Sequence, residues 1–227
     1  MASGRTRPPP TRSPKPPVRG AGARTYALLL STTMNAIRDG HVPSIAEVAV
    51  RARVSRATAY RYFPSRSVLI TAVVDTSLAP VRSWQSKKTD GRARVTEIFT
   101  NTFPSFKEFE PQLRAAVQLS LEQWALERAG LLEEEPYRRG HRIGILNHAV
   151  QPFEGKLKPR MLDRLKKALS VIYGIESHIV LKDIWGVKDR EVASIALWMA
   201  DALVSAALQE VQATPASRPS KRTRSAK

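Results

Sequence analysis

Apolar and polar positions between residues 44 and 64 follow a helical pattern that is interrupted once. Four apolar residues share one helix face at i, i+3, i+4 and i+7: Ile45, Val48, Ala49 and Ala52. Ser44 precedes this stripe and Ser55 precedes the next helical run, each where a hydroxyl can cap a helix. Pro64 discourages continuation of the second run. The pattern predicts two short capped helices joined by a tight turn.

Helical patterns also flank this pair of helices. The upstream stripe consists of Tyr26, Leu30, Met34 and Ile37. Gly40 follows it, where a glycine that ends a helix is expected. Downstream, Ser65 can cap a helix whose apolar side is formed by Val68, Leu69, Ala72 and Val73. We expect a compact three-helix unit and a fourth helix that links it to the rest of the chain.

The remaining chain, to about residue 213, has a helical pattern throughout, without alternating strands or an internal repeat. We therefore predict an all-α protein. Middle helices are expected at 92–103, 111–129 and 138–153. Breaks are expected at Asp90-Gly91, Pro104, Pro111, Gly130, Pro136, Pro152, Pro159 and Gly186.

Two apolar segments lie near the end of the chain. One stripe is formed by Leu165, Leu169, Ile172, Ile175 and Ile179. The next helix, which starts near Asp189, is apolar on several faces, with Val192, Ile195, Leu197, Met199, Leu203, Val204 and Leu208. A helix that is apolar nearly all round must be covered on both sides. We expect these last two long helices to form a homodimer interface; an ordinary core helix is the alternative.

Charge changes the picture at the two ends. The chain of 227 residues carries a formal net charge of +17, and the basic residues up to Arg24 and beyond residue 213 supply eleven of these charges. Residues 1–23 are rich in Pro, Ser and Gly and predict a disordered basic arm, and 214–227 a disordered basic tail. The arm could follow the DNA backbone or reach the minor groove; a solubilising tail is the alternative.

The second capped helix carries Arg, Thr and Tyr on its polar side. The run VSRATAYRYFPSR from Val54 to Arg66, after the Gly40 stop and the Ser44 cap, resembles the DNA-binding domain of the TetR family of bacterial repressors over about a quarter of the chain. The family usually shows Gly, Leu and Lys where this chain has Arg53, Ala59 and Arg66. The resemblance implies a helix-turn-helix DNA-binding domain at 24–79 and a larger helical ligand-binding and dimerisation domain at 80–213.

Roles follow from this resemblance and from chemistry. Arg56 and Arg61 are candidates for base edges, since a guanidinium can donate two parallel bonds to guanine, and Ala57 could touch a thymine methyl. The other candidates for DNA contact, mostly to phosphates, are Ser44, Ser55, Thr58, Tyr60, Tyr62 and Arg66. The alternative is that the tyrosines are packed aromatics and the arginines a solvated face.

The middle helices are where such regulators hold a ligand. Aromatic and polar candidates for a pocket that binds an unknown small-molecule effector are Phe103, Phe106, Trp124, Tyr137, Arg142, His148 and Tyr173. Each could equally be an ordinary core residue. We expect no cofactor and no metal, because the histidine spacing does not match a zinc site.

Other function classes find little support in the chain. There is no Gly-rich phosphate loop, nucleophile elbow or HExxH, and the acidic run 133–135 is interpreted as a solvated connection, so no catalytic residue is assigned. Zero cysteines exclude disulfides and are compatible with the cytoplasm, and no run of about 18 apolar residues predicts a membrane span. We expect a cytoplasmic, non-enzymatic, homodimeric repressor on a palindromic double-stranded DNA operator. A nucleic-acid-coating protein that binds through its tails is the alternative.

Overall fold

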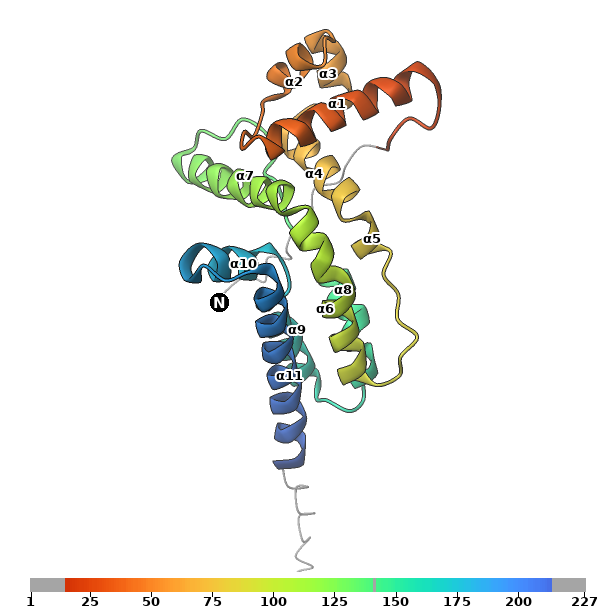
Figure 1. The fold of residues 1–227 in the computed structure, drawn as a ribbon, viewed down its shortest axis with the longest axis vertical. Coiled ribbons are helices and arrows are strands. Elements are labelled where there is room, and N and C mark those ends of the chain that lie inside the picture. Colours follow the sequence, from red (N-terminus) through yellow and green to blue (C-terminus); the bar gives the residue numbers. More distant parts are fainter. Residues whose placement is uncertain (1–14, 141, 214–227) are drawn as a thin grey trace, which may run out of the picture.

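The computed structural model describes residues 15–140 and 142–213, and this part of the chain contains helices and no strand (Figure 1). The prediction of an all-α protein is confirmed. The elements are α1 (Gly20–Arg38), α2 (Ile45–Arg51), α3 (Arg56–Tyr62), α4 (Arg66–Ser77), α5 (Ala79–Arg82), α6 (Gly91–Glu108), α7 (Glu110–Ala129), α8 (Arg142–Val150), the 3₁₀ turn η1 (Gln151–Phe153), α9 (Pro159–Ile172), α10 (Ile175–Ile179), the π-helical turn η2 (Val180–Ile184) and α11 (Asp189–Ala213).

Helices α1, α2 and α3 pack together at one end of the molecule (Figure 1). Their shared core contains Tyr26, Leu29, Ile45, Val48 and Phe63, all buried. The ring centroids of Tyr26 and Phe63 lie 5.0 Å apart. Helix α4 leaves this core and packs along α7, which also contacts α1. We call α1–α3 the head and the helices from α6 onward the body.

The body is built around α6 and α11, which pack against each other, with α9 on α11 and α8 against both α6 and α9. Helix α7 lies crosswise between the head and α10 (Figure 1). Aromatic rings of α6 meet at the centre of the body: the centroids of Phe99 and Phe103 are 5.2 Å apart, and Phe106 lies edge-on to Tyr173 at 5.3 Å. Large, rigid rings therefore fill the centre of the body.

Three sequence predictions are corrected by the helix bounds. Pro104 lies inside α6 rather than at a break, because the buried residues around it keep the helix packed on both sides of the lost hydrogen bond. The stripe from Leu165 to Ile179 is divided, because Gly174, at φ 143°, separates α9 from α10. Helix α1 begins at Gly20, so it includes the last residues of the predicted arm; residues 1–14 and 214–227 lie outside the described part.

Helix α11 has an unusual surface. Five residues on one side of it are buried against the body: Val192, Ala196, Ala200, Val204 and Ala207. Within the described chain it is the one helix long and apolar enough to cross a bilayer by length and composition, with a mean hydropathy of 1.5 over Asp189–Val211. Only 28% of that apolar window is buried inside the chain. Much of its apolar surface is therefore left for something other than this chain to cover.

Candidate functional site

The start of α2 is held by a reciprocal cap. The Ser44 hydroxyl accepts a hydrogen bond from the backbone N–H of Glu47 at 3.2 Å, and the Glu47 carboxylate accepts one from the Ser44 N–H at 2.7 Å. His41 lies 3.1 Å from the other Glu47 oxygen. The hydrogen bond from the Ser44 backbone is the main reason why the pKa of Glu47 falls to about 2. Ser44 is thus committed to fixing the helix.

The turn between α2 and α3 contains a residue in the left-handed backbone conformation, which is costly for any residue other than glycine. Arg53 has φ 55°, and among the described non-glycine residues it alone has a positive φ. Its N–H donates to the Val50 carbonyl at 3.1 Å, and the Val54 N–H donates to the Ala49 carbonyl at 3.0 Å. This pair of bonds is the Schellman pattern, which normally places a glycine where Arg53 stands. A tight turn forms although the usual residue is absent.

Helix α3 presents a polar face to solvent. The Ser55 hydroxyl accepts from the Thr58 N–H at 3.2 Å and donates to the Thr58 hydroxyl at 2.9 Å, which caps the helix. Ala59 is buried against the head core. The exposed positions follow i, i+1, i+4 and i+5, which places them on one side of the helix: Arg56, Ala57, Tyr60 and Arg61. Arg56 and Arg61 therefore lie on the same exposed side of α3, away from the core of the head.

Two predicted contact residues lie elsewhere. Tyr62 is partly buried, with its ring edge-on to that of Tyr26 at 6.1 Å and the Arg61 guanidinium 5.3 Å above its centroid. Arg66 is directed toward the body, where its Nη1 lies 3.2 Å from a carboxylate oxygen of Glu122 in α7. The sequence placed Arg66 with the phosphate contacts; the structure instead places it in an ion pair between α4 and α7. Sequence spacing could not reveal a partner 56 residues away.

A polar junction joins the first turn of α4 to the segment 131–140. The Arg66 backbone N–H donates to Glu134 at 2.9 Å, and the Ser67 hydroxyl donates to the Glu135 carbonyl at 2.8 Å. The amide of Gln123 donates to Glu134 at 2.6 Å and accepts from the Tyr137 N–H at 2.5 Å. The interpretation of 133–135 as a solvated connection holds for the exposed Glu133 and Glu135, but it missed that Glu134 binds the start of α4.

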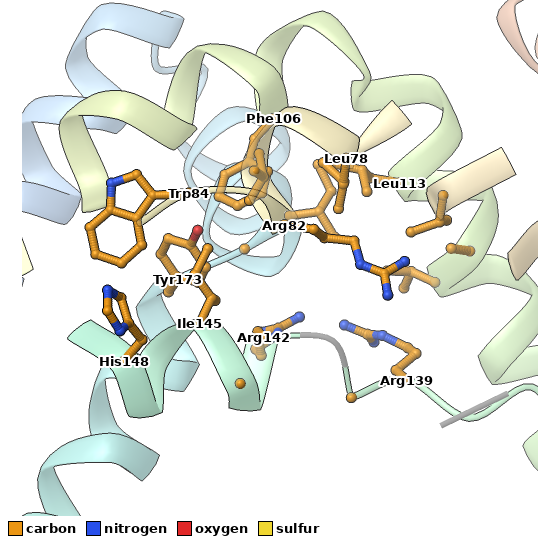
Figure 2. Close-up of a pocket in the computed structure, with 18 of the residues that line it drawn as sticks. Leu78, Arg82, Trp84, Phe106, Leu113, Arg139, Arg142, Ile145, His148 and Tyr173 are labelled. Atoms are coloured by element: carbon orange, nitrogen blue, oxygen red, sulfur yellow. The ribbon is translucent and has the colours of Figure 1, made fainter. Parts of the chain in front are cut away.

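A cavity of about 260 Å³ lies in the body, beside this junction (Figure 2). Five of the predicted pocket residues line it: Phe106, Tyr137, Arg142, His148 and Tyr173. Phe103 does not, because it is buried among the other rings of α6. Trp124 does not either, because its side chain is 61% exposed on α7, beneath Arg128. The sequence missed Arg82, Trp84 and Arg139 on the cavity wall. Arg82 and Trp84 belong to a short helix and an irregular segment, and Arg139 precedes α8, which starts at Arg142 rather than at the predicted residue 138.

Hydrogen bonds and burial hold the polar groups around the cavity. The His148 Nε2 accepts the Ser86 backbone N–H at 3.1 Å. The Tyr173 hydroxyl donates to Thr102 at 2.9 Å, and burial raises the pKa of Tyr173. Burial also raises the pKa of Tyr137 to about 12. The permanent positive charge on the cavity wall therefore comes from Arg82, Arg139 and Arg142.

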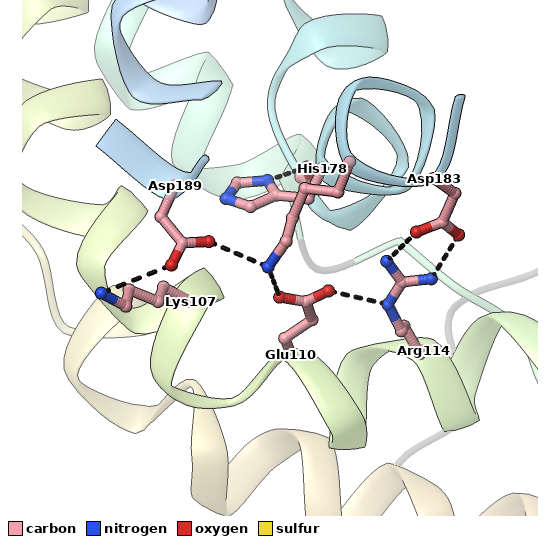
Figure 3. Close-up of polar contacts among 8 residues, drawn as sticks. Lys107, Glu110, Arg114, His178, Asp183 and Asp189 are labelled. Carbon is pink, nitrogen blue, oxygen red and sulfur yellow. Dashed lines mark hydrogen bonds and ion pairs between the residues drawn. The ribbon is translucent and has the colours of Figure 1, made fainter. Parts of the chain in front are cut away.

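A network of ion pairs connects α7, η2 and the start of α11 (Figure 3). Glu110 of α7 accepts from Lys182 at 2.6 Å and from Arg114 at 2.8 Å, and Arg114 also makes two bonds of 2.7 Å to Asp183. Lys182 continues to Asp189 at 2.9 Å. Burial lowers the pKa of the nearby His178, whose ring contributes no charge near pH 7. The network ties α7, η2 and α11 together.

Within 15–140 and 142–213, no group of three or more His, Cys, Asp or Glu side chains is placed to hold a metal ion. The comparison of the chain with protein families finds no match, and the comparison with curated proteins finds none either. Functional interpretation therefore rests on the exposed face of α3, the junction at α4 and the cavity.

Proposed function

We propose that this protein is a sequence-specific DNA-binding transcriptional regulator, a ligand-responsive repressor that acts as a homodimer and resembles the TetR family. The head then serves as a helix-turn-helix domain, with α3 as the helix that enters the major groove. The observation that carries the proposal is that Arg56 and Arg61 lie on the exposed face of α3. This helix is capped at its start and packs against the core of the head through Ala59. Arginines on such a helix can read guanine edges.

The neighbouring hydroxyls suit contacts to the DNA backbone. Tyr60 is 46% exposed on the same face, and Thr58 stands at the start of α3, where the helix dipole favours a phosphate. Ser44 caps α2, and its hydroxyl, which accepts a hydrogen bond from the Glu47 N–H, still has its O–H to donate to a phosphate. These groups would fix the register of the head on the duplex and would carry no sequence information themselves. Arg66 is not among them, because Glu122 holds its guanidinium.

The open surface of α11 supports a homodimer. On α11 the Trp198 side chain is 72% exposed, and on α9 Val171 is equally exposed. Large exposed apolar side chains on two adjacent helices are typical of a surface that another chain covers. Two copies of the same surface related by a two-fold axis would also place two heads on a palindromic operator.

The junction at α4 offers a route by which an effector could change DNA affinity. Tyr137 lines the cavity, and its backbone is bound to Gln123, which also binds Glu134 at the start of α4. Movement of 131–140 on ligand binding would therefore displace α4 and the head attached to it. Release requires that the ligand bind more tightly to the state whose heads are wrongly spaced for the operator. Glu134→Gln is expected to reduce the effect of ligand on operator affinity while leaving ligand affinity within about twofold.

The proposal is tested by selecting bound sequences from random duplex DNA at near-physiological salt. Wild type is compared with the double variant Arg56→Ala, Arg61→Ala. A second double variant, Arg128→Ala, Lys156→Ala, removes the same number of charges from exposed positions of the body. We expect a palindromic motif with wild type and with the control, and its loss with the α3 variant.

Other outcomes would reject the proposal. Binding without sequence preference that survives in both double variants would favour a coating protein that uses its basic tails. Deleting the two tails would then abolish binding, whereas a repressor would keep its sequence preference with a smaller salt dependence.

A further inference from the structure

We propose that the cavity binds an amphipathic carboxylate, with its apolar chain inside the body and its carboxylate at the arginines of the cavity wall. This inference rests on the proposed function, since it names the chemical class of the effector. It is carried by the distribution of apolar and charged groups around this cavity and around a second cavity that shares its arginines.

The interior of the cavity is apolar. Side chains from α4–α8 line it, among them Leu78, Phe106, Leu113, Val117 and Ile145. Figure 2 shows Phe106 and Leu113 on one side, with Ile145 across from them. The volume of about 260 Å³ lies just below the roughly 300–1,000 Å³ typical of ligand pockets. Such a space suits one flexible hydrocarbon chain or a small ring system.

Three arginines from separate segments converge on one part of this cavity. Arg82 comes from α5, Arg139 from the segment 131–140 and Arg142 from α8, and Figure 2 shows all three side chains directed into the same region. Arg139 and Arg142 also line an adjoining polar cavity of about 420 Å³, together with Arg138. The arginines thus mark the boundary between an apolar interior and a polar opening.

More basic than acidic side chains line this boundary. Four lining residues of the two cavities are arginines, and Glu176 is the one carboxylate among the described lining residues. Glu176 pairs with both Arg139 and Arg142, while Asp75, from α4, pairs with Arg82. Counting both acids still leaves an excess of positive charge.

Arg142 shows that the site has the geometry to receive a carboxylate. Its Nη2 donates to both oxygens of Glu176, at 2.8 and 2.7 Å, and its Nη1 donates to the Ser170 carbonyl at 2.8 Å. The guanidinium lies over Gly174, where a Cβ atom would come within 3.0 Å of it. Arg142 is therefore preorganised, and a second carboxylate can bind beside Glu176 through Arg139 and Arg82.

The test uses three probes with the same ten-carbon chain: decanoate, decan-1-ol and decylamine. Each is titrated calorimetrically into the full-length protein near pH 7, without DNA and below its micelle concentration. Charge-assisted hydrogen bonds predict that decanoate binds about 10- to 100-fold more tightly than decan-1-ol, and that decylamine binds weakest. Equal affinity for decanoate and decan-1-ol in the wild-type protein would overturn the proposal without any variant.

Substitutions identify the residues that cause the preference for decanoate. Arg139→Met is expected to reduce the preference for decanoate over decan-1-ol by about tenfold while leaving decan-1-ol binding unchanged. The matched control is Arg128→Met, which removes an arginine of α7 that does not line the cavity and is expected to keep the full preference. Val117→Trp fills the interior and is expected to abolish binding of both probes. A preference that survives Arg139→Met, or that is lost in Arg128→Met, would contradict the assignment.

This experiment can fail independently of the proposed function. A decanoate preference without any selected operator would leave the cavity assignment standing and reject the regulator. A selected operator with no decanoate preference would reject only the ligand class.

Discussion

Side-chain hydrogen bonds in the head and those around the cavity differ in the sequence separation of their partners. In the head, side-chain hydrogen bonds connect residues three to six positions apart, as in Ser44 with Glu47 and Ser55 with Thr58. Around the cavity the partners are far apart in the chain: Arg142 reaches Ser170 over 28 positions, and Ser67 reaches Glu135 over 68.

This difference has consequences for stability. A local cap forms with its own helix, so its loss destabilises one turn. A bond between distant segments forms only when both are packed, so it depends on the whole arrangement. We expect substitutions in the head to act locally and substitutions near the cavity to be transmitted between helices. Four experiments test this contrast, in order of decreasing effect.

The largest effect is expected for Phe63→Ala. Phe63 is 1% exposed and its ring packs at a tilt against that of Tyr26, so truncation leaves a cavity that costs about 3–5 kcal/mol. If the head is a local unit, hydrogen exchange should quicken in α1–α3 far more than in α6–α11. Val50→Ala, at an exposed position of α2, serves as the control and should change little. Equal loss of protection in α6–α11 would mean that head and body unfold as one unit.

The body is tested by two glycine substitutions. A Cβ on Gly91 would lie 2.5 Å from the Phe153 ring, so Gly91→Ala is expected to cost about 1–3 kcal/mol of unfolding free energy. A Cβ on Gly144, in α8, would meet no neighbour within 4 Å, and Gly144→Ala should gain about 0.5–1 kcal/mol. Urea denaturation measures both. A gain at both sites would show that helix propensity, rather than the contact with Phe153, decides the outcome.

A smaller effect of opposite sign is expected in the head turn. Arg53→Gly relieves the positive φ of 55° and should raise the unfolding free energy by about 0.5–1 kcal/mol, after the greater backbone entropy of glycine is counted. Arg51→Gly removes the same charge from the last helical position of α2 and should lower stability by about 1 kcal/mol. Stabilisation by both substitutions would point to charge repulsion instead.

The smallest effect concerns pH. Glu47 has a pKa near 2 in the folded protein against 4.5 as its ordinary value. The folded state therefore favours the carboxylate, and the stabilisation is complete above about pH 4.5 and disappears as the pH falls through about 2. The difference in stability between wild type and Glu47→Gln should shrink over this window. A difference that grows on acidification would contradict the capping role.

The same contrast explains what could be predicted from the sequence. All three serine caps, Ser44, Ser55 and Ser65, accept the expected backbone hydrogen bonds. Gly40 also ends α1 with a positive φ. These features depend on a few adjacent residues, which the sequence displays directly.

The features of the body that escaped prediction depend on distant partners or on irregular backbone. Gly174 divides an apolar stripe that has regular spacing, and Pro104 remains inside a helix because burial outweighs its missing N–H. Arg139 lies in a predicted helix but in an irregular segment of the structure, and Trp124 is an aromatic residue typical of a pocket but has an exposed position. Only the packing of the chain distinguishes these cases.

The contact between Glu134 and the start of α4 also has a practical side for biosensor engineering. Residues 131–136 belong neither to the exposed face of α3 nor to the lining of the cavity, which begins with Tyr137 in this segment. In the proposed repressor, libraries restricted to residues 131–136 would therefore be expected to vary the dynamic range and threshold of a reporter circuit, with the same operator and the same effector.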